Sequence, residues 1–66
     1  MQITLNGKIH ILEKETSIAS LITDLQLDPR KIAIEYNLTI IPCKEYDDIY
    51  ITEGDVLEIV QFIGGG

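Results

Sequence analysis

The sequence is poor in cysteine and in positive charge, and these shortages disfavour several classes of protein. Its 66 residues contain one cysteine, Cys43, so an intramolecular disulfide framework and a cysteine-based zinc site are ruled out. Only 5 Lys and Arg stand against 11 Asp and Glu, a net charge of −6. A nucleic-acid-binding function needs clustered positive charge, so it is not expected. The acidic charge suits docking on a basic protein surface, and simple solubility explains it equally well.

Long apolar runs are also missing. No stretch approaches the roughly 18 apolar residues that a membrane-spanning helix needs, so no membrane partner is expected. The lone cysteine and the absence of a signal-peptide pattern after Met1 predict a cytoplasmic protein. So short a chain buries only about 60% of its unfolded surface. An enzyme pocket of roughly 300–1,000 Å³ does not fit easily in such a core, so size favours a binding or carrier module over an enzyme.

Alternation and turn residues predict an N-terminal β-hairpin. Residues 2–5 and 8–12 alternate polar and apolar side chains. Asn6-Gly7 between them tolerates the two positive φ angles of a type I′ turn. Parity within the second segment predicts that His10 faces outward, where a lone histidine is interpreted as an ordinary surface residue.

Helical periodicity follows the hairpin. Thr16 or Ser17 is predicted to cap a helix over residues 17–26. Apolar residues recur there at i, i+3, i+4 and i+7, namely Ile18, Leu21, Ile22 and Leu25. Asp28-Pro29 is predicted to end the segment, because the residue before a proline is pushed out of the helical region.

Three more strands are predicted, over residues 31–36, 39–41 and 56–62. Pro42 cannot donate to a ladder, so the middle one is assigned to an edge. One amphipathic helix needs one sheet face to cover, and the simplest arrangement is an α+β fold: a ubiquitin-like β-grasp, with a mixed sheet packed on one main helix. The first and last strands are expected to lie parallel and central.

The chain ends in an apolar run followed directly by Gly64-Gly65-Gly66. Residues 1–63 are assigned to the β-grasp domain and residues 64–66 to a flexible glycine tail. Glycine packs against nothing and loses the most backbone entropy on ordering, but its thin backbone passes through channels too narrow for a Cβ atom. We interpret the tail as a presented peptide end whose reactive group is the α-carboxylate of Gly66. A frayed terminus or a cloning remnant is the alternative.

The last strand supplies a candidate docking patch. Parity places Leu57 and Ile59 on the inner face, and Glu58, Val60 and Phe62 on the outer one. Exposed apolar residues beside a reactive tail predict a partner-docking surface. We therefore assign docking to Glu58, Val60, Phe62 and Ile63. Scattered surface residues without a binding role are the alternative for this set.

Several of these features together resemble one family. They are the Asn6-Gly7 hairpin, the helix opening at Thr16-Ser17, Ile40-Ile41-Pro42, the Glu53-Gly54-Asp55 turn and the terminal Phe62-Ile63-Gly64-Gly65-Gly66. The chain resembles, over its full length, the bacterial sulfur carrier protein of thiamin biosynthesis, the ThiS type, within the ubiquitin-like β-grasp superfamily. A glycine pair alone is a weak signal, whereas a pair at the end of a β-grasp pattern of this size is specific.

The resemblance implies a mechanism. A partner adenylyltransferase of the ubiquitin-activating type (ThiF-like) would use ATP to adenylate the Gly66 carboxylate. A sulfur donor such as a cysteine desulfurase would convert the adenylate into a thiocarboxylate, which would donate its sulfur to a thiazole synthase (ThiG-like). Gly64 and Gly65 would let the tail pass into the partner sites. The chain would be a substrate and not an enzyme, with no bound cofactor.

Three alternatives stay open. Within the superfamily, the chain could be the small subunit of a molybdopterin synthase or a conjugation tag of the ubiquitin kind. From another class, it could be a plain interaction module with an incidental glycine tail. Cys43 has no histidine at a catalytic spacing, so we interpret it as an incidental thiol. No metal site is predicted, because residues 45–48 lack regular calcium-loop spacing.

Overall fold

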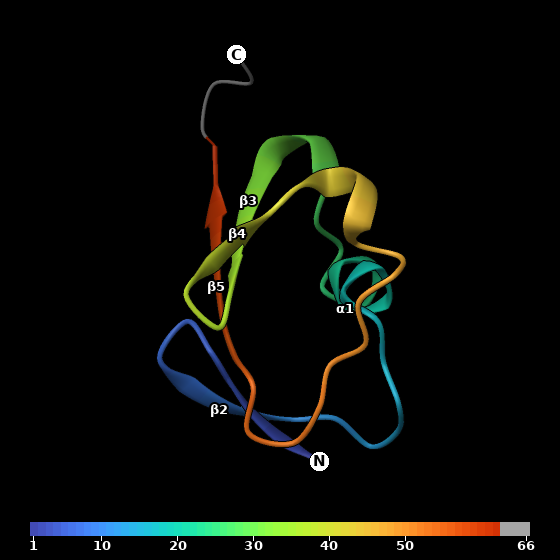
Figure 1. Ribbon diagram of the computed structural model, residues 1–66, viewed down its shortest axis with the longest axis vertical. Coiled ribbons are helices and arrows are strands. Elements are labelled where there is room, and N and C mark those ends of the chain that lie inside the picture. The colour runs from blue at the N-terminus through green and yellow to red at the C-terminus, as the bar shows by residue number, and fades with distance from the viewer. Residues whose placement is uncertain (63–66) are drawn as a thin grey trace.

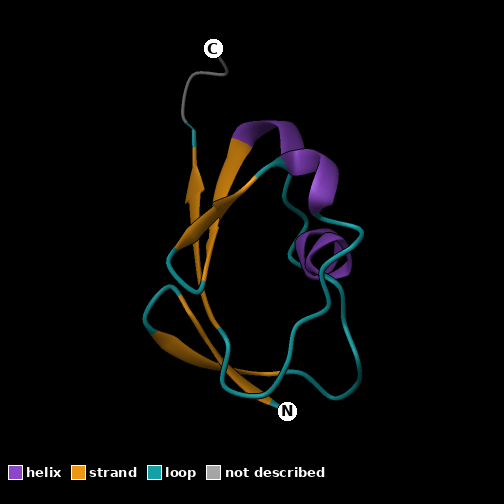
Figure 2. Cartoon of the chain, in the orientation of Figure 1, coloured by secondary structure: helices purple, strands orange, loops and turns teal. Residues whose placement is uncertain are grey.

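The computed structural model describes residues 1–62 of the chain as one mixed sheet covered on one face by a helix. The sheet order is β2-β1-β5-β3-β4 (Figure 1). The elements are β1 (Gln2–Leu5), β2 (Lys8–Ile11), α1 (Ile18–Asp24), the 3-10 turn η1 (Pro29–Lys31), β3 (Ile32–Tyr36), β4 (Thr39–Ile41), the 3-10 turn η2 (Cys43–Glu45) and β5 (Val56–Gln61). Figure 2 shows the helical elements on one side of the strands, which confirms the predicted α+β arrangement.

The N-terminal hairpin forms where it was predicted. Asn6 and Gly7 have φ angles of 51° and 79°, the positive pair that a type I′ turn requires. The outward position of His10, however, is wrong. His10 lies opposite Ile3 across the β1–β2 pair, and opposite residues share a face. Ile3 is buried, so His10 is on the inner face and half-buried, whereas Ile9 and Ile11 are exposed.

Helix α1 begins at its predicted cap and ends earlier than predicted. The Ser17 hydroxyl accepts a hydrogen bond from the Ser20 backbone N–H at 3.1 Å. The helix stops at Asp24, and Gln26 beyond it has a φ of 60°, which breaks the helical path. Asp28-Pro29 does not end α1 but starts η1, where Asp28 accepts the Arg30 backbone N–H at 2.9 Å.

The core lies between the sheet and α1. Its buried apolar residues are Ile3, Leu12, Ile18, Leu21, Ile22, Ile32, Ile34, Ile41, Tyr46, Ile51 and Leu57. Strand β5 runs through the middle of the sheet, parallel to β1 and antiparallel to β3. The parallel first and last strands are therefore confirmed, as is the edge position of β4.

The segment between β4 and β5 closes the core over the start of α1. The first N–H groups of a helix have no partner inside the helix. Here the N–H groups of Ile18 and Ala19 donate to the carbonyls of Ile49 and Tyr46, each at 2.9 Å. None of the helices in the described part of the chain, residues 1–62, has the length and hydropathy of a membrane-spanning segment.

Candidate functional site

The candidate site is the C-terminal end of β5, the strand that leads to the glycine tail. Figure 1 shows β5 running toward the end of the molecule opposite the N-terminus. Ile63 and Gly64-Gly65-Gly66 lie outside the described residues, so the predicted roles of these four positions stay predictions. The structure describes β5 and Phe62, which precede that segment in the sequence.

Backbone hydrogen bonds hold β5 in register up to its last described residue. The β3–β5 pairing extends from Tyr36 opposite Leu57 to Ile32 opposite Gln61. Beyond the strand, the Phe62 N–H donates to the Lys31 carbonyl at 2.7 Å. The chain is therefore fixed as far as Phe62, four residues before Gly66.

On its other side, β5 extends beyond the end of its neighbour β1. The β1–β5 pairing ends with Leu5 opposite Leu57, because the chain then turns at Asn6-Gly7. The Asn6 side chain takes over at this point, since its Oδ1 accepts the Ile59 N–H at 2.7 Å. A side chain from the hairpin turn thus replaces the missing strand partner at one position.

At the opposite end of the strand, buried Asp55 holds the start of β5 in place. Its carboxylate accepts hydrogen bonds from the Tyr36 hydroxyl at 2.6 Å, Asn37 Nδ2 at 3.2 Å, the Thr52 N–H at 2.8 Å and Thr52 Oγ1 at 3.1 Å. Burial raises the pKa of Asp55, but these donors together outweigh burial and leave the pKa below its usual value. The pKa of Tyr36 is raised in turn to about 12, chiefly by its hydrogen bond to Asp55 and secondly by burial.

This cluster was not predicted from the sequence, where Glu53-Gly54-Asp55 was interpreted as a turn and Asp55 was given no partner. A signal was present in the Thr52-Glu53-Gly54-Asp55 spacing, since an Asp can accept the N–H of the residue that opens its own turn. Tyr36 and Asn37 carry no such signal, because the fold alone brings them to Asp55.

The outer sheet face carries the predicted docking residues. Val60 is 58% exposed and Phe62 is 53% exposed, and Glu58 is exposed as well. A shallow depression on this face is lined by Ala33, Glu35, Leu38, Ile40, Val56, Glu58 and Val60. The structure thus gathers Glu58 and Val60 with side chains from β3 and β4 that the sequence did not group with them. Binding of a partner there stays a prediction.

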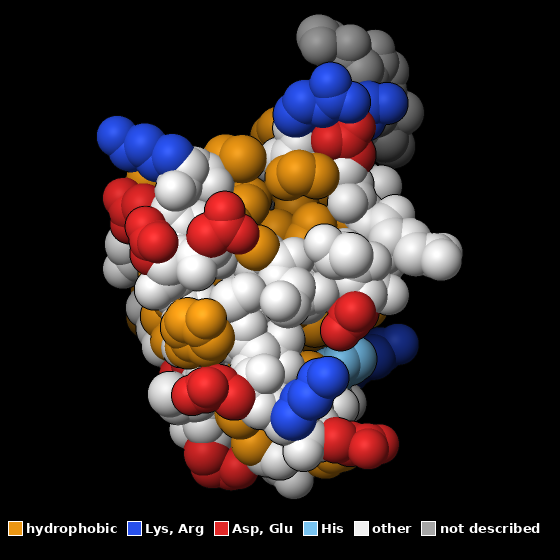
Figure 3. Space-filling model, turned by 90° about the vertical axis from the view of Figure 1, so that its right-hand side faces the viewer, with side chains coloured by type: hydrophobic (Ala, Val, Ile, Leu, Met, Phe, Trp, Pro, Cys, Tyr) orange, Lys and Arg blue, Asp and Glu red, His pale blue; other side chains and the backbone are white. Residues whose placement is uncertain are grey.

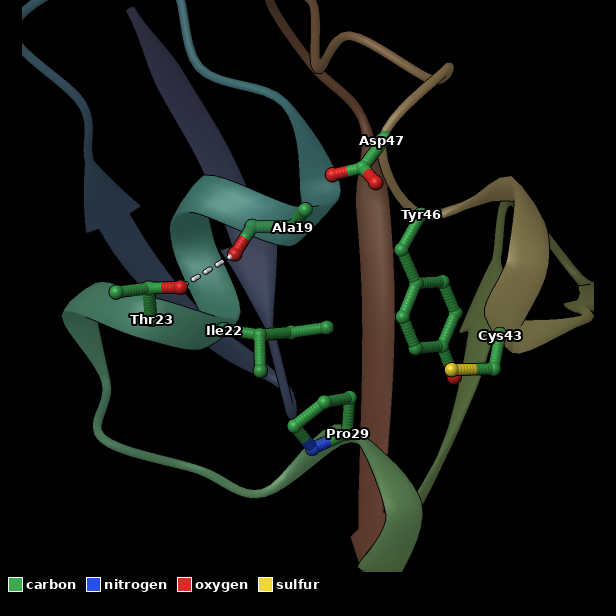
Figure 4. Close-up of a pocket in the computed structure, with 7 residues that line it drawn as sticks. All are labelled: Ala19, Ile22, Thr23, Pro29, Cys43, Tyr46 and Asp47. Carbon is green, nitrogen blue, oxygen red and sulfur yellow. Dashed lines mark hydrogen bonds between the residues drawn. The ribbon is translucent and has the colours of Figure 1, made fainter.

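A second hollow lies on the face that carries α1. Figure 3 views the molecule from this side, with apolar side chains gathered in its upper half among charged ones. The cavity measures about 190 Å³ and is lined by Ala19, Ile22, Thr23, Pro29, Cys43, Tyr46 and Asp47 (Figure 4). Burial, and secondly the nearby Cys43, raise the pKa of Tyr46.

This cavity offers no obvious chemistry for its thiol. Cys43 is exposed, and none of the seven lining residues is a histidine, lysine or arginine that would activate it. Among the described residues, no group of three His, Cys, Asp or Glu side chains is arranged to hold a metal ion. The end of β5 therefore stays the best candidate for function.

The comparisons with known proteins agree on one family. The model of the ThiS family matches residues 3–66. The sulfur carrier protein ThiS of Bacillus subtilis is 38% identical over 63 residues, covering 94% of this chain and 96% of that protein. The crystal structure of a thiamine biosynthesis protein (ThiS) from Geobacter metallireducens superposes with a TM-score of 0.85 at 25% identity, over 100% of both chains.

Another relative, much longer than this chain, is named as a thiazole synthase and not as a sulfur carrier. A thiazole synthase of Paramagnetospirillum magneticum is 39% identical over 66 residues. The match takes in the whole of this chain and only 20% of that protein. The chain thus spans about a fifth of the length of this relative.

Proposed function

The chain belongs to the ThiS family, and we propose that it is a sulfur carrier that delivers sulfur, on Gly66, for the thiazole moiety of thiamin. The family membership confirms the resemblance inferred from the residues, and the β-grasp fold with it. The observation that carries the proposal is β5, a central strand whose backbone is held by β3 and Lys31 up to Phe62, with Ile63 and three glycines following in the sequence.

The chemistry begins with activation, because a carboxylate is a poor electrophile. A Gly66 carboxylate oxygen attacks the α-phosphate of ATP in the adenylyltransferase, and pyrophosphate leaves. The persulfide sulfur of a donor such as a cysteine desulfurase then attacks the acyl-adenylate and displaces AMP, which forms an acyl disulfide. A second thiol cleaves this disulfide by exchange, becomes part of a new disulfide with the donor cysteine, and so supplies the two electrons that leave a thiocarboxylate on Gly66. Its sulfur is the nucleophile that the thiazole synthase receives. The chain itself is the substrate in each step and binds no cofactor of its own.

The fold sets the reach of this group. Four residues follow Phe62, the last of them Gly66, and an extended chain spans at most about 3.3–3.6 Å per residue. The carboxylate can therefore enter a partner to a depth of roughly 13–14 Å beyond the anchored strand. Such a reach through a narrow channel requires residues without a Cβ atom, which is the role proposed for Gly64 and Gly65.

Intact mass of the protein isolated from its native host tests the proposal. A carrier shows a gain equal to the exchange of one oxygen for one sulfur, and a variant lacking Gly66 does not. Higher-mass conjugates to other proteins would instead indicate a conjugation tag. A chain that is never modified, and whose Gly66 can be deleted without loss of thiamin synthesis, would contradict the proposal and favour an interaction module.

Substitution along the tail tests the passage. Gly65→Ala places a Cβ next to the reacting residue, whereas Gly64→Ala places it one residue farther out. We expect Gly65→Ala to slow ATP–pyrophosphate exchange by the adenylating partner much more than Gly64→Ala does. Equal losses for the two variants would contradict the assigned roles.

A further inference from the structure

Two glutamates face each other on the outer side of the sheet, beside the predicted docking residues. Glu35 on β3 lies directly opposite Glu58 on β5, and Ile40 on β4 lies opposite Glu35 from the other side. The next pair on the same face of the sheet, toward the tail, is Ala33 opposite Val60. The two acidic side chains therefore stand side by side within an apolar surround.

The hydrogen-bond pattern between β3 and β5 determines the distance between the two glutamates. The Asn37 N–H bonds to the Val56 carbonyl, and Glu35 and Glu58 are two residues further along each strand. They therefore form a hydrogen-bonded pair, whose Cα atoms lie about 5.5 Å apart. Two carboxylates at this separation can both reach one cationic group between them.

In the free carrier this arrangement is unfavourable. Like charges directly opposite on neighbouring strands destabilise a sheet. The ion pair found among residues 1–62 joins Arg30 to Asp28, and neither Glu35 nor Glu58 takes part in it. The repulsion between Glu35 and Glu58 therefore lowers the stability of the fold, and no ion pair within residues 1–62 offsets it.

We propose that Glu35 and Glu58 form a socket for an arginine of the adenylating partner. The proposal rests on the proposed function and identifies how that partner is recognised. A planar guanidinium presents five donors in a fixed fork and can bond both carboxylates at once. Its apolar stem packs on Ile40 and Val60, which are 64% and 58% exposed. Arginine is also among the residues that dominate binding energy at protein interfaces.

Charge complementarity favours the adenylating partner as the occupant. An enzyme that holds the triphosphate of ATP beside a carboxylate needs positive charge around that site. The carrier brings a net charge of −6 to it. Eight residues follow Glu58 and span at most roughly 26–29 Å when extended, so an arginine outside the pocket that receives the carboxylate can occupy the socket. The socket acts on affinity and leaves the chemical step unchanged.

The experiment compares Glu35→Gln, Glu58→Gln and the double variant with a matched control, Glu15→Gln. Glu15 is an exposed glutamate before α1, and its substitution changes the net charge by the same amount. The Kd for the adenylating enzyme of the same host is measured without ATP, and kcat and KM of ATP–pyrophosphate exchange are measured separately. Thermal unfolding of each free variant is recorded as well.

We expect each socket variant to raise the Kd about tenfold or more, the scale of a lost hydrogen bond to a charged group. The double variant should lose less than the product of the two single losses, because both carboxylates hold the same guanidinium. The control should change the Kd less than about twofold, since an exposed charge outside the contact adds little. We expect kcat to stay unchanged. The thermal midpoints of both single variants should rise or stay the same, because a repulsion is removed.

Three results would overturn the socket. They are an unchanged Kd, an equal change in the Glu15→Gln control, and a joint loss of affinity and thermal stability, which would indicate a structural role. A zero-length carbodiimide cross-link from either glutamate to a partner lysine would overturn the choice of arginine, because guanidinium does not react in this way. If the wild-type chain supports no pyrophosphate exchange, the proposed function fails, while the affinities still decide the socket.

Discussion

The two ends of β5 differ in what surrounds their side chains. At the beginning, Val56 is 41% exposed, but its neighbours Asp55 and Leu57 are buried, and several donors from other segments converge on Asp55. At the other end, Val60 and Phe62 are more than half exposed. The backbone, by contrast, is held in register along the whole strand by β3. One strand therefore anchors itself at one end and presents side chains at the other.

A small domain can therefore expose one end of a strand for binding while its core stays packed. The backbone hydrogen bonds fix where the end points, while the exposed side chains leave it free for contact. Changes at the beginning of β5 should therefore affect stability, and changes at its end should affect partner binding. Substitutions along this one strand test whether the two effects are separate.

The largest effect is expected for Leu57→Ala. Leu57 is 0% exposed at the centre of the core, and a buried leucine truncated to alanine costs about 2–5 kcal/mol of folding free energy. A domain of this length has a total stability of only about 3–10 kcal/mol. Urea unfolding of Leu57→Ala against Val60→Ala measures the contrast, since the exposed position should lose less than about 0.5 kcal/mol. Similar losses at both positions would contradict the proposed separation.

The next effect is expected from pH through Asp55. Its pKa is lowered in the folded state, so its stabilisation is complete above the unfolded pKa near 3.8. The stabilisation is lost as pH falls from that value through the lower folded pKa. Its size is about 1–3 kcal/mol, the scale of hydrogen bonds to a charged acceptor.

Urea unfolding at a series of pH values below 5 checks this expectation. Asp55→Asn, which cannot ionise, should be less stable at neutral pH and should lose less stability on acidification. An unchanged acid dependence in this variant would show that other carboxyl groups determine it.

A smaller effect, confined to binding, is expected for Phe62→Asp. An aromatic anchor removed from an interface weakens binding by about tenfold or more, or about 1.4 kcal/mol. Phe62 is 53% exposed, so the free energy of unfolding should change by less than about 0.5 kcal/mol. Ile11→Asp provides a control with the same change in charge at another exposed apolar position. A large loss of stability with intact binding would contradict the assignment of Phe62 to docking.

The sequence predicted the features that depend on local chemistry. Asn6-Gly7 specifies its turn through its own backbone preferences, and Ser17 caps α1 through neighbouring N–H groups. The face of His10 could not be predicted, because alternation gives the parity of a strand but not which side the core lies on. The sheet register with Ile3 decides that.

The site was predictable only in the part that lies along one strand. Val60 and Phe62 were assigned to the outer face from alternation within residues 56–62. The neighbour of Glu58 was not predictable, since Glu35 becomes adjacent only through the β3–β5 register. The Asp55 cluster was missed for the same reason, as Tyr36 is 19 positions away in the chain.

The smallest effect is expected at Asn6, whose side chain meets β5 between its two ends. Asn6→Gly keeps the positive φ of 51° accessible but removes the Oδ1 that accepts the Ile59 N–H. The cost should be about 1 kcal/mol, because water can replace the lost acceptor at an exposed site. Amide hydrogen exchange should become faster at Ile59 and stay unchanged at Glu58, whose N–H faces β3. Faster exchange along the whole strand would mean that Asn6 supports both ends, and that the anchored and presenting halves of β5 are not independent.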